Sequence, residues 1–385
     1  MAVQILYTYD KAGGGAVVGD LFAISEKLAW SKKRNAVDAI SFSMSLRKLA
    51  EWCESRNFDI ARFFTPIKSS VVIVARDGTP IIGGFLASTP EFSFSQNPDS
   101  IVQFNFVGWL GIATGYNLKP VISYNEALNS QLVKGVNLAL TAANAKGAPW
   151  PISVGTHLDT LATVQNTVDS PKKLADFLTE RTDNLDGAGP FDIYFRENGQ
   201  FEIWKNLGTD ISRETTISWP DRGQVGGAKA LEFPAWENYY SDIFLTGSGN
   251  GYGDGGGAIT STKTNTDTVA NTGFYELATS LSSISDQDTL DSRATSYLRY
   301  TATPFSTPKA TIDAEQFKIY DHRYGGNLWI GDTLAVDVSS GLAKLLPIEQ
   351  FAKFRVDSID VSYDKQGRGV AVLNFIDPTG GTNIS

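Results

Sequence analysis

Alternation of apolar and polar residues dominates the first part of the chain. Residues 99–109 (DSIVQFNFVGW) repeat with a period of two, which is typical of a strand that is buried on one face. Residues 70–85 predict a hairpin, because Asp77-Gly78 between two apolar runs supplies the left-handed conformations of a tight turn. Residues 46–57 are the best helix candidate here. The amino-terminal part is therefore expected to be mainly β.

The middle of the chain mixes helix and strand patterns. Residues 124–143 place apolar side chains at near-helical spacing, which predicts an amphipathic helix. Residues 170–182 predict a second helix, because they begin with Ser-Pro: serine caps helix starts and proline favours the first helical position. A third helix is predicted after residue 285, where acidic residues lie at the positive end of the helix.

The end of the chain returns to strands, at 332–338, 354–363 and 370–375. A further hairpin is predicted at 191–204, which has Asn-Gly in its loop. The carboxy-terminal strands repeat the rhythm of residues 70–106. A chain with similar β-units at both ends and α/β material between them predicts two related barrels with insertions.

Residues 247–273 consist almost entirely of Gly, Ser, Thr, Asn and Asp. This composition buries little apolar surface, so the segment is predicted to be one long, flexible, exposed loop. It contains a Gly-x-Gly-x-x-Gly match at Gly251, Gly253 and Gly256, but no predicted helix follows to hold a pyrophosphate. A nucleotide-dependent enzyme is therefore a weakly supported alternative.

Composition excludes several classes of protein. The 385 residues suffice for two or three domains, and 22 Phe, 14 Tyr and 8 Trp exclude a disordered chain. With 33 Lys and Arg against 42 Asp and Glu, the formal net charge is −9. This balance speaks against binding to duplex nucleic acid or to an anionic membrane.

Residues with catalytic or metal-binding chemistry are few. Cys53 is the single cysteine, so the chain has no internal disulfide, and two histidines do not complete a Cys/His zinc site. His157 and Asp159 share one strand face and His322 lies in a polar segment, but no nucleophile motif accompanies them. Two groups of acidic residues are better explained by their positions at helix ends. These are Asp286, Asp288 and Asp291, considered as a calcium loop, and Asp183 with Asp186, considered as a glycosidase pair.

The amino terminus and the hydropathy pattern bear on location. Residues 1–20 lack the basic start and apolar stretch of a signal peptide. No window reaches the roughly 18 uninterrupted apolar residues of a membrane-spanning helix. The chain is therefore expected to have no membrane span and to be made in the cytoplasm.

Several segments together resemble one protein family. They are the hairpin at 70–85, the segment 148–155 (APWPISVG) with the predicted helix 170–182, and the segments 331–336 (GDTLAV) and 355–362 (RVDSIDVS). Their order across nearly the whole chain resembles the tail hub proteins of long-tailed bacteriophages. That group is related to the baseplate hubs of contractile phages and injection machines.

The resemblance implies a mainly β fold with α+β insertions, in which two tube-like β-barrel domains carry a peripheral α/β region. The expected ranges are 1–112 for the first barrel, 206–240 with 308–385 for the second, and 113–205 with 241–307 for the peripheral region, which includes the flexible loop 247–273.

The resemblance also implies a function. Three copies would form a homotrimeric ring at the distal end of the tail tube, around a channel that genomic DNA crosses without specific binding. The expected partners are the distal tail (tube-end) protein, the tape-measure protein, and tip, fibre or spike proteins. Such a hub belongs to the virion, is assembled in the host cytoplasm, and has no catalytic residue, cofactor or metal.

Two surface hypotheses follow. The acidic balance predicts a channel lined by negative charge, which would repel phosphates and let the genome slide. Loop residues expected to contact a neighbouring tail component are Gly247, Asn250, Tyr252, Asp254 and Gly257.

The main alternative is a secreted or surface carbohydrate-active or carbohydrate-binding β-protein. It would use tryptophans and paired carboxylates on a loop-rich face. The missing export signal argues against this alternative.

Overall fold

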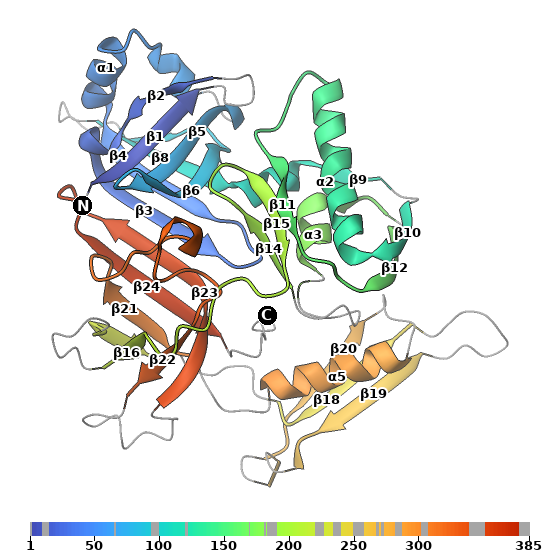
Figure 1. Cartoon of the computed structure of the whole chain (residues 1–385). Helices are drawn as coiled ribbons and strands as arrows, with labels where there is room; N and C mark the ends of the chain where they lie inside the picture. Colours follow the sequence, from blue (N-terminus) through green and yellow to red (C-terminus); the bar gives the residue numbers. More distant parts are fainter. Residues whose placement is uncertain are drawn as a thin grey trace.

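The computed structural model is a mainly β chain, with an α/β region beside it and a small α/β module at one end (Figure 1). The mainly β fold class is confirmed. Within the described residues, no helix is long and apolar enough to cross a bilayer. The structure describes residues 2–9, 15–64, 67–93, 100–119, 122–168, 170–180, 182, 191–219, 227–233, 240–248, 258–266, 269–270, 273–281, 287–301, 307–338 and 351–376.

The amino-terminal half is built from strands because its apolar and polar residues alternate. In β8 (Ile101–Gly108), for example, Val102, Phe104 and Phe106 are buried while the residues between them are not. The helix α1 (Leu46–Glu54) follows β4 directly, as predicted. The other strands of this half are β1 (Val3–Tyr9), β2 (Val17–Asp20), β3 (Ser25–Lys33), β4 (Ala39–Ser45), β5 (Ile67–Arg76), β6 (Thr79–Leu86) and β7 (Glu91–Ser93), with 3-10 turns at Phe22–Ile24 and Ile60–Phe64.

The carboxy-terminal half contains the strands that the end of the sequence predicts. The short 3-10 helix η5 (His322–Tyr324) lies between two of these strands, β21 and β22. Its strands are β16 (Thr216–Ser218), β17 (Ala230–Glu232), β21 (Lys309–Asp313), β22 (Thr333–Asp337), β23 (Phe351–Tyr363) and β24 (Gly369–Ile376).

One hydrogen-bonded sheet joins the two halves. Its order is β17-β21-β24-β23-β3-β4-β8-β6-β5-β1-β2. The junction is the antiparallel pair of β3 and β23, whose register runs from Ser358 opposite Lys33 to Tyr363 opposite Leu28. The described strands therefore form one continuous sheet through both expected barrel domains, and the number of barrels stays a prediction.

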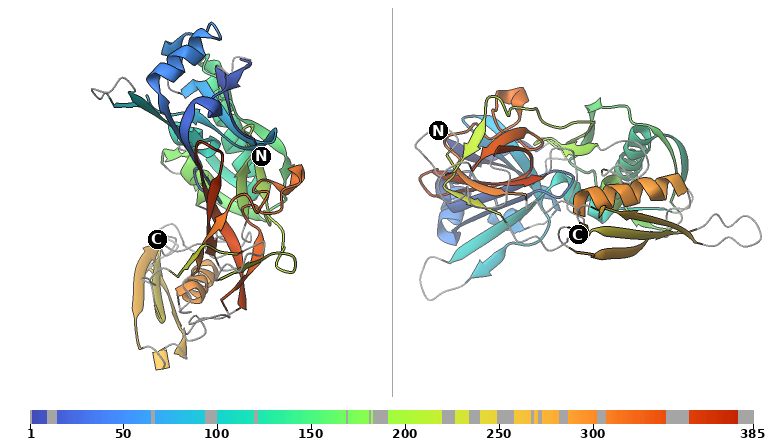
Figure 2. Two further views of the ribbon diagram at one scale, coloured as in Figure 1. Left: turned by 90° about the vertical axis from the view of Figure 1, so that its left-hand side faces the viewer. Right: turned by 90° about the horizontal axis from the view of Figure 1, so that it is seen from below.

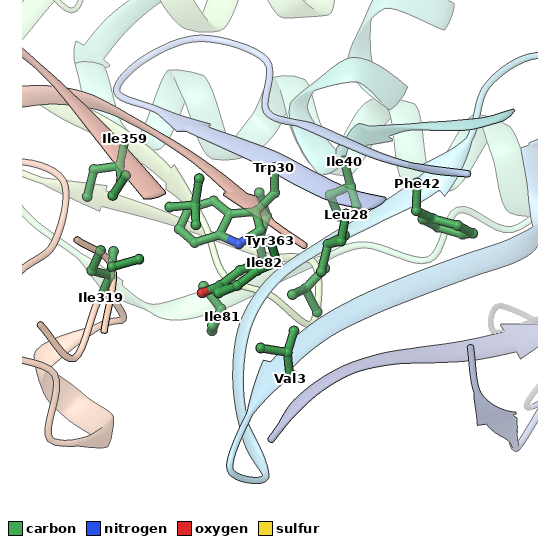
Figure 3. Packing of buried hydrophobic residues seen from close by; sticks show 14 of the residues in the cluster. Val3, Leu28, Trp30, Ile40, Phe42, Ile81, Ile82, Ile319, Ile359 and Tyr363 are labelled. Atoms are coloured by element: carbon green, nitrogen blue, oxygen red, sulfur yellow. The ribbon is translucent and has the colours of Figure 1, made fainter. Parts of the chain in front are cut away.

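A single hydrophobic core also spans both halves. Trp30 of β3 and Ile359 and Tyr363 of β23 lie in one cluster with Ile82 and Val3 of the amino-terminal half (Figure 3). Along β23, Ile359 and Tyr363 are buried while Asp360 and Ser362 are not, so one side of the sheet faces the core there and the other does not.

The α/β region has its own core beneath two helices. The helix α2 (Leu128–Ala145) packs against α3 (Leu174–Thr179), and Gly135 lets the Phe177 ring approach the backbone of α2. The predicted helix 124–143 thus begins later, since the preceding residues form β10. The remaining elements are η4 (Trp109–Gly115), β9 (Asn117–Leu118), β10 (Ile122–Ala127), β11 (Ser153–Leu158), β12 (Thr163–Val168), β13 (Lys172–Lys173), β14 (Asp192–Phe195) and β15 (Gln200–Trp204).

The predicted start of the second helix is wrong. Lys172 and Lys173 are extended and pair with β9, and the backbone N–H of Leu174 donates to the carbonyl of Tyr116. The helix therefore begins at Leu174, without a side-chain cap. Pairing with a distant strand outweighs the local Ser-Pro signal.

The small module contains β18 (Asp242–Gly247), β19 (Ile259–Thr264), β20 (Glu276–Leu281) and α5 (Gln287–Thr301). Figure 2 places it at the opposite end of the molecule from the amino-terminal half. The prediction of one continuous loop at 247–273 is wrong for residues 259–264, because these form β19. Threonine-rich segments favour strands when one face is covered, and Ser261 is buried beneath α5.

Candidate functional site

The side of the continuous sheet that faces away from the main core is exposed or half-buried across its central strands, which come from both halves. We call it the open sheet face. Directly opposed residues in antiparallel strands share a face, so the register identifies its members. They are exposed or half-buried, and the central ones are Ala29, Ser31, Ser41, Ser43, Gln103, Asn105, Thr311, Asp360, Ser362, Val370, Val372 and Asn374.

Small hydroxyl, amide and aliphatic side chains dominate this face. One row of opposed residues runs from Val370 through Ser362, Ala29 and Ser41 to Asn105. None of these side chains is long, so the surface is low and even. A shallow hollow of about 250 Å³ lies in it, lined among others by Ala29, Ser41, Ser362 and Val370.

The charge of the open sheet face is nearly balanced. The register places Lys27, Lys33 and Lys309 on it. The acidic side chains that the register places on it are Glu91, Glu232, Asp313 and Asp360. Asp360 accepts a hydrogen bond from Nδ2 of Asn374 at 3.0 Å. A charged hollow of about 530 Å³ adjoins this face, with Lys229, Asp313, Asp364 and Arg368 in its wall.

A buried carboxylate joins both halves to the α/β region. Asp192, the first residue of β14, is 1% exposed. Its Oδ1 accepts from Nη1 of Arg34 at 3.0 Å, and its Oδ2 accepts from Nη2 of Arg355 at 2.7 Å. The Leu207 backbone N–H also donates to Oδ2. Arg34 follows β3 and Arg355 lies in β23, so one carboxylate holds three parts of the chain.

Lys32 adds a second contact between the first half and the β14–β15 hairpin. Lys32 Nζ donates to Oδ2 of Asp38 at 2.7 Å and to the carbonyl of Phe195 at 2.9 Å. Burial raises the pKa of Asp38, although Lys32 opposes that effect. Gly83 is needed nearby, because a Cβ there would lie 1.9 Å from the carbonyl oxygen of Glu197. The β14–β15 hairpin is thus seated closely against the first half.

A further polar cluster seats this hairpin against the second half. Arg323 of η5 donates to Glu202 at 3.0 Å and to Asp321 at 2.5 Å. Burial opposes ionisation of Asp321, but the hydrogen bonds from Arg323 outweigh it and lower the pKa of this carboxyl. The hydroxyl of Tyr194 donates to Asp321, and burial raises the pKa of Tyr194 well above the usual value.

Both histidines take part in contacts of this kind. His322 Nε2 lies 2.8 Å from Oδ1 of the fully buried Asp332, and this hydrogen bond raises the pKa of His322 to about 9. The His157 ring stacks on Trp204 with 3.3 Å between centroids, and Nε2 lies 3.3 Å from Oδ1 of Asp159. In the described part of the chain, no three His, Cys, Asp or Glu side chains are placed to hold a metal ion.

The other candidate residues fall in three places. Cys53 is buried in α1, and burial raises its pKa to about 11. Asp291 accepts from the Ser261 hydroxyl at 2.5 Å and so anchors α5 on β19. Gly247 is buried at the end of β18. Candidates that lie outside the described residues are Asn250, Tyr252, Asp254, Gly257, Asp183, Asp186 and Asp286, with the glycine match at Gly251, Gly253 and Gly256.

Sequence patterns did not identify Asp192, Arg34 or Arg355. One signal for Asp192 exists in the sequence: a lone acid in the otherwise apolar run FDIYF of a predicted strand. A charged residue at a core position needs a partner. The partners lie 158 and 163 positions away in the sequence, so the sequence alone does not identify them.

Solved structures with a similar fold include tail proteins. A tail protein from Neisseria meningitidis has a TM-score of 0.64 and 13% identity, with 99% of each chain covered. The 43 kDa tail protein of prophage MuSo2 from Shewanella oneidensis has a TM-score of 0.62 and 14% identity, covering 98% of this chain and 100% of that one. The prophage tail protein gp18 from Listeria monocytogenes has a TM-score of 0.54 and 10% identity, covering 96% and 94%.

The fold is therefore that of phage tail proteins, and the resemblance to the tail hub family is confirmed at the level of the fold. Neither a protein-family model nor a curated protein matches the sequence.

Proposed function

We propose that this chain is the structural hub of a phage tail tip or baseplate. Three copies would close into a ring that continues the channel of the tail tube, with the open sheet face of each copy toward the channel. The observation that carries this proposal is the continuity of that face across β4, β3, β23 and β24, which belong to the two halves. A channel wall needs an uninterrupted surface, and a single sheet through both halves supplies one.

The chemistry of the open sheet face suits the passage of DNA. Phosphates bind to clustered lysine and arginine side chains, with release of counterions. On this face hydroxyl and amide groups predominate, and the three lysines that the register places there are matched by four carboxylates, one of which, Glu232, lies opposite Lys309. The wall would therefore hold no phosphate firmly. In this proposal the lining is nearly neutral, whereas the net charge of the chain predicted an acidic one.

The remaining features fit a joint between tail components. The peripheral α/β region is seated on both halves through Asp192 and Arg323, so it would move with the ring as one body. It would present surfaces to the distal tail protein above and to tip, fibre or spike proteins below. The tape-measure protein and the genome would occupy the channel, and no step of this function requires catalysis.

Electron microscopy of the purified protein tests the ring directly. We expect negative-stain class averages with threefold symmetry and an open centre wide enough for a DNA duplex. Addition of the tube-end protein from the same phage would favour closure if single copies predominate. Only monomers under both conditions would contradict the proposed ring.

Arginines placed on the open sheet face should hinder DNA passage without unfolding the protein. Ser41 and Ser362 flank Ala29 in one row, so S41R with S362R creates a paired cationic site. We expect the titre of phage carrying this double variant to fall at least tenfold, while the thermal midpoint of the isolated protein stays within a few degrees.

The matched control places two arginines elsewhere. N137R with T141R adds the same charge on the exposed side of α2, away from the open sheet face. This control should keep the normal titre. Equal losses in both double variants would show that added charge, rather than its position on the face, causes the defect.

A further inference from the structure

Among the described strands, the small module has one unprotected sheet edge, that of β20. Its strand order is β19-β18-β20, so among the described strands β19 and β20 each have one unpaired side. On β19, Lys263 adds charge and α5 packs above. The strand β20 pairs with β18 in unbroken register over all six residues, and its only charged residue is Glu276 at its start. Natural sheets seldom leave a regular, uncharged edge uncovered.

The unpaired side of β20 presents its own set of backbone groups. The carbonyl of Tyr275 accepts from the Asp242 backbone N–H of β18. Because backbone groups alternate in direction along a strand, those of Leu277 and Thr279 also point to β18. The N–H and C=O groups of Ala278 and Ser280 therefore point away from the sheet, where they are available to another strand.

Apolar side chains beside this edge are incompletely covered. Leu277 and Leu281 are on the same side of the sheet as α5, but α5 packs on β18 and β19, and both leucines remain half-exposed. Phe274 and Tyr275, just before the strand, are 62% and 56% exposed. An added strand would cover apolar surface as well as satisfy backbone groups.

We propose that the edge of β20 pairs with β20 of a second copy of this chain. The strand ELATSL is self-complementary in an antiparallel arrangement centred on Thr279. Leu277 of each copy then lies opposite Leu281 of the other, and Ala278 exchanges both backbone hydrogen bonds with Ser280. The two Glu276 carboxylates lie at opposite ends, so like charges are kept apart. A parallel arrangement would place them side by side.

This contact is separate from the contacts within the proposed ring. A twofold contact is isologous, so it links two copies and closes there. Where rings of three copies exist, it would join two rings through their small modules. Loss of the twofold contact leaves the ring intact, and the two proposals fail independently.

Light scattering on size-exclusion fractions measures the association. The N–H of Ala278 points away from β18, so Ala278→Pro removes one hydrogen-bond donor from the free edge and no bond to β18. Proline is tolerated on the solvent side of an edge strand. We expect at least tenfold weaker pairing than in the wild type, seen as a mass that stays at half the wild-type value at high concentration. Thr262→Pro is the control, because Thr262 is in the same row on the other edge and also points its N–H outward.

Disulfide trapping tests the register and does not depend on the proline variant folding. In the proposed arrangement the two Thr279 Cα atoms lie about 4.5 Å apart as a non-hydrogen-bonded pair, which is within disulfide range. Thr279→Cys should form a covalent dimer under mild oxidation, whereas Thr262→Cys should not. Equal cross-linking of the two variants, together with equal masses of the wild type and Ala278→Pro, would overturn the proposal.

Discussion

Replacement of Asp192 by alanine is expected to lower the free energy of unfolding by roughly 3–5 kcal/mol. The carboxylate is 1% exposed and receives hydrogen bonds from Arg34 and Arg355, which are themselves buried. Without it, two guanidinium groups remain in a poorly hydrated site, where Arg34 keeps the part-exposed Asp357 and Arg355 keeps, among the described residues, only backbone carbonyls as partners. Chemical denaturation monitored by tryptophan fluorescence measures the loss.

Two further variants distinguish the cost of leaving buried charges unpaired from the cost of losing any ion pair. The Asp210–Lys353 pair has a similar length of 3.2 Å but lies on the surface, so Asp210→Ala should leave the unfolding midpoint almost unchanged. Adding Arg34→Met to Asp192→Ala removes one of the two buried guanidinium groups that lost Asp192 as a partner. This double variant should therefore recover part of the lost stability. A loss under about 1 kcal/mol in the single variant would contradict the joining role of Asp192.

Local signals in the sequence identified the hairpins well. Asp77 and Gly78 have φ values of 50° and 80°, as the tight turn between β5 and β6 requires, and Gly199 has a φ of 89° in the second hairpin. Each signal lies within a few residues of the structure that it specifies. No distant contact is needed to form these turns, so they are predictable from the sequence.

Long-range pairing was not predictable in the same way. The junction of β3 with β23 depends on a register between residues about 330 positions apart, and alternation specifies only which side of each strand is buried. The open sheet face follows from that register. Most of its central members are small residues that carry no motif in the sequence, and they become a surface only when six strands align them.

The strand β19 shows a limit of composition as a guide. The run ITSTKT is polar, and with the glycine-rich residues before it the sequence predicted a loop. Its alternate residues nevertheless lie on the two sides of a sheet, with Ser261 buried and Thr260 and Thr262 exposed. Pairing to β18 and cover by α5 stabilise a strand that its own composition would not.

Stability is expected to fall as the pH rises from about 6.5 to 9, because His322 loses its proton. The hydrogen bond with Asp332 raises the pKa of His322 to about 9, above its ordinary 6.5. A pKa that is higher in the folded state means that the folded protein binds the proton more tightly than the unfolded chain does. The stabilising contribution is therefore complete below pH 6.5 and is lost as the pH passes through 9.

This contribution should be roughly 2 kcal/mol, since each pH unit between the two pKa values is worth about 1.4 kcal/mol and the ring is partly exposed. The free energy of unfolding, measured by denaturation at several pH values, gives the slope. In His322→Gln the amide keeps a polar contact but has no proton to lose, so the decline should largely disappear. Burial raises the pKa of Cys53 to about 11, so its thiol does not titrate in this window. A decline of equal size in His322→Gln would assign the pH dependence to another group and contradict the role of the His322–Asp332 pair.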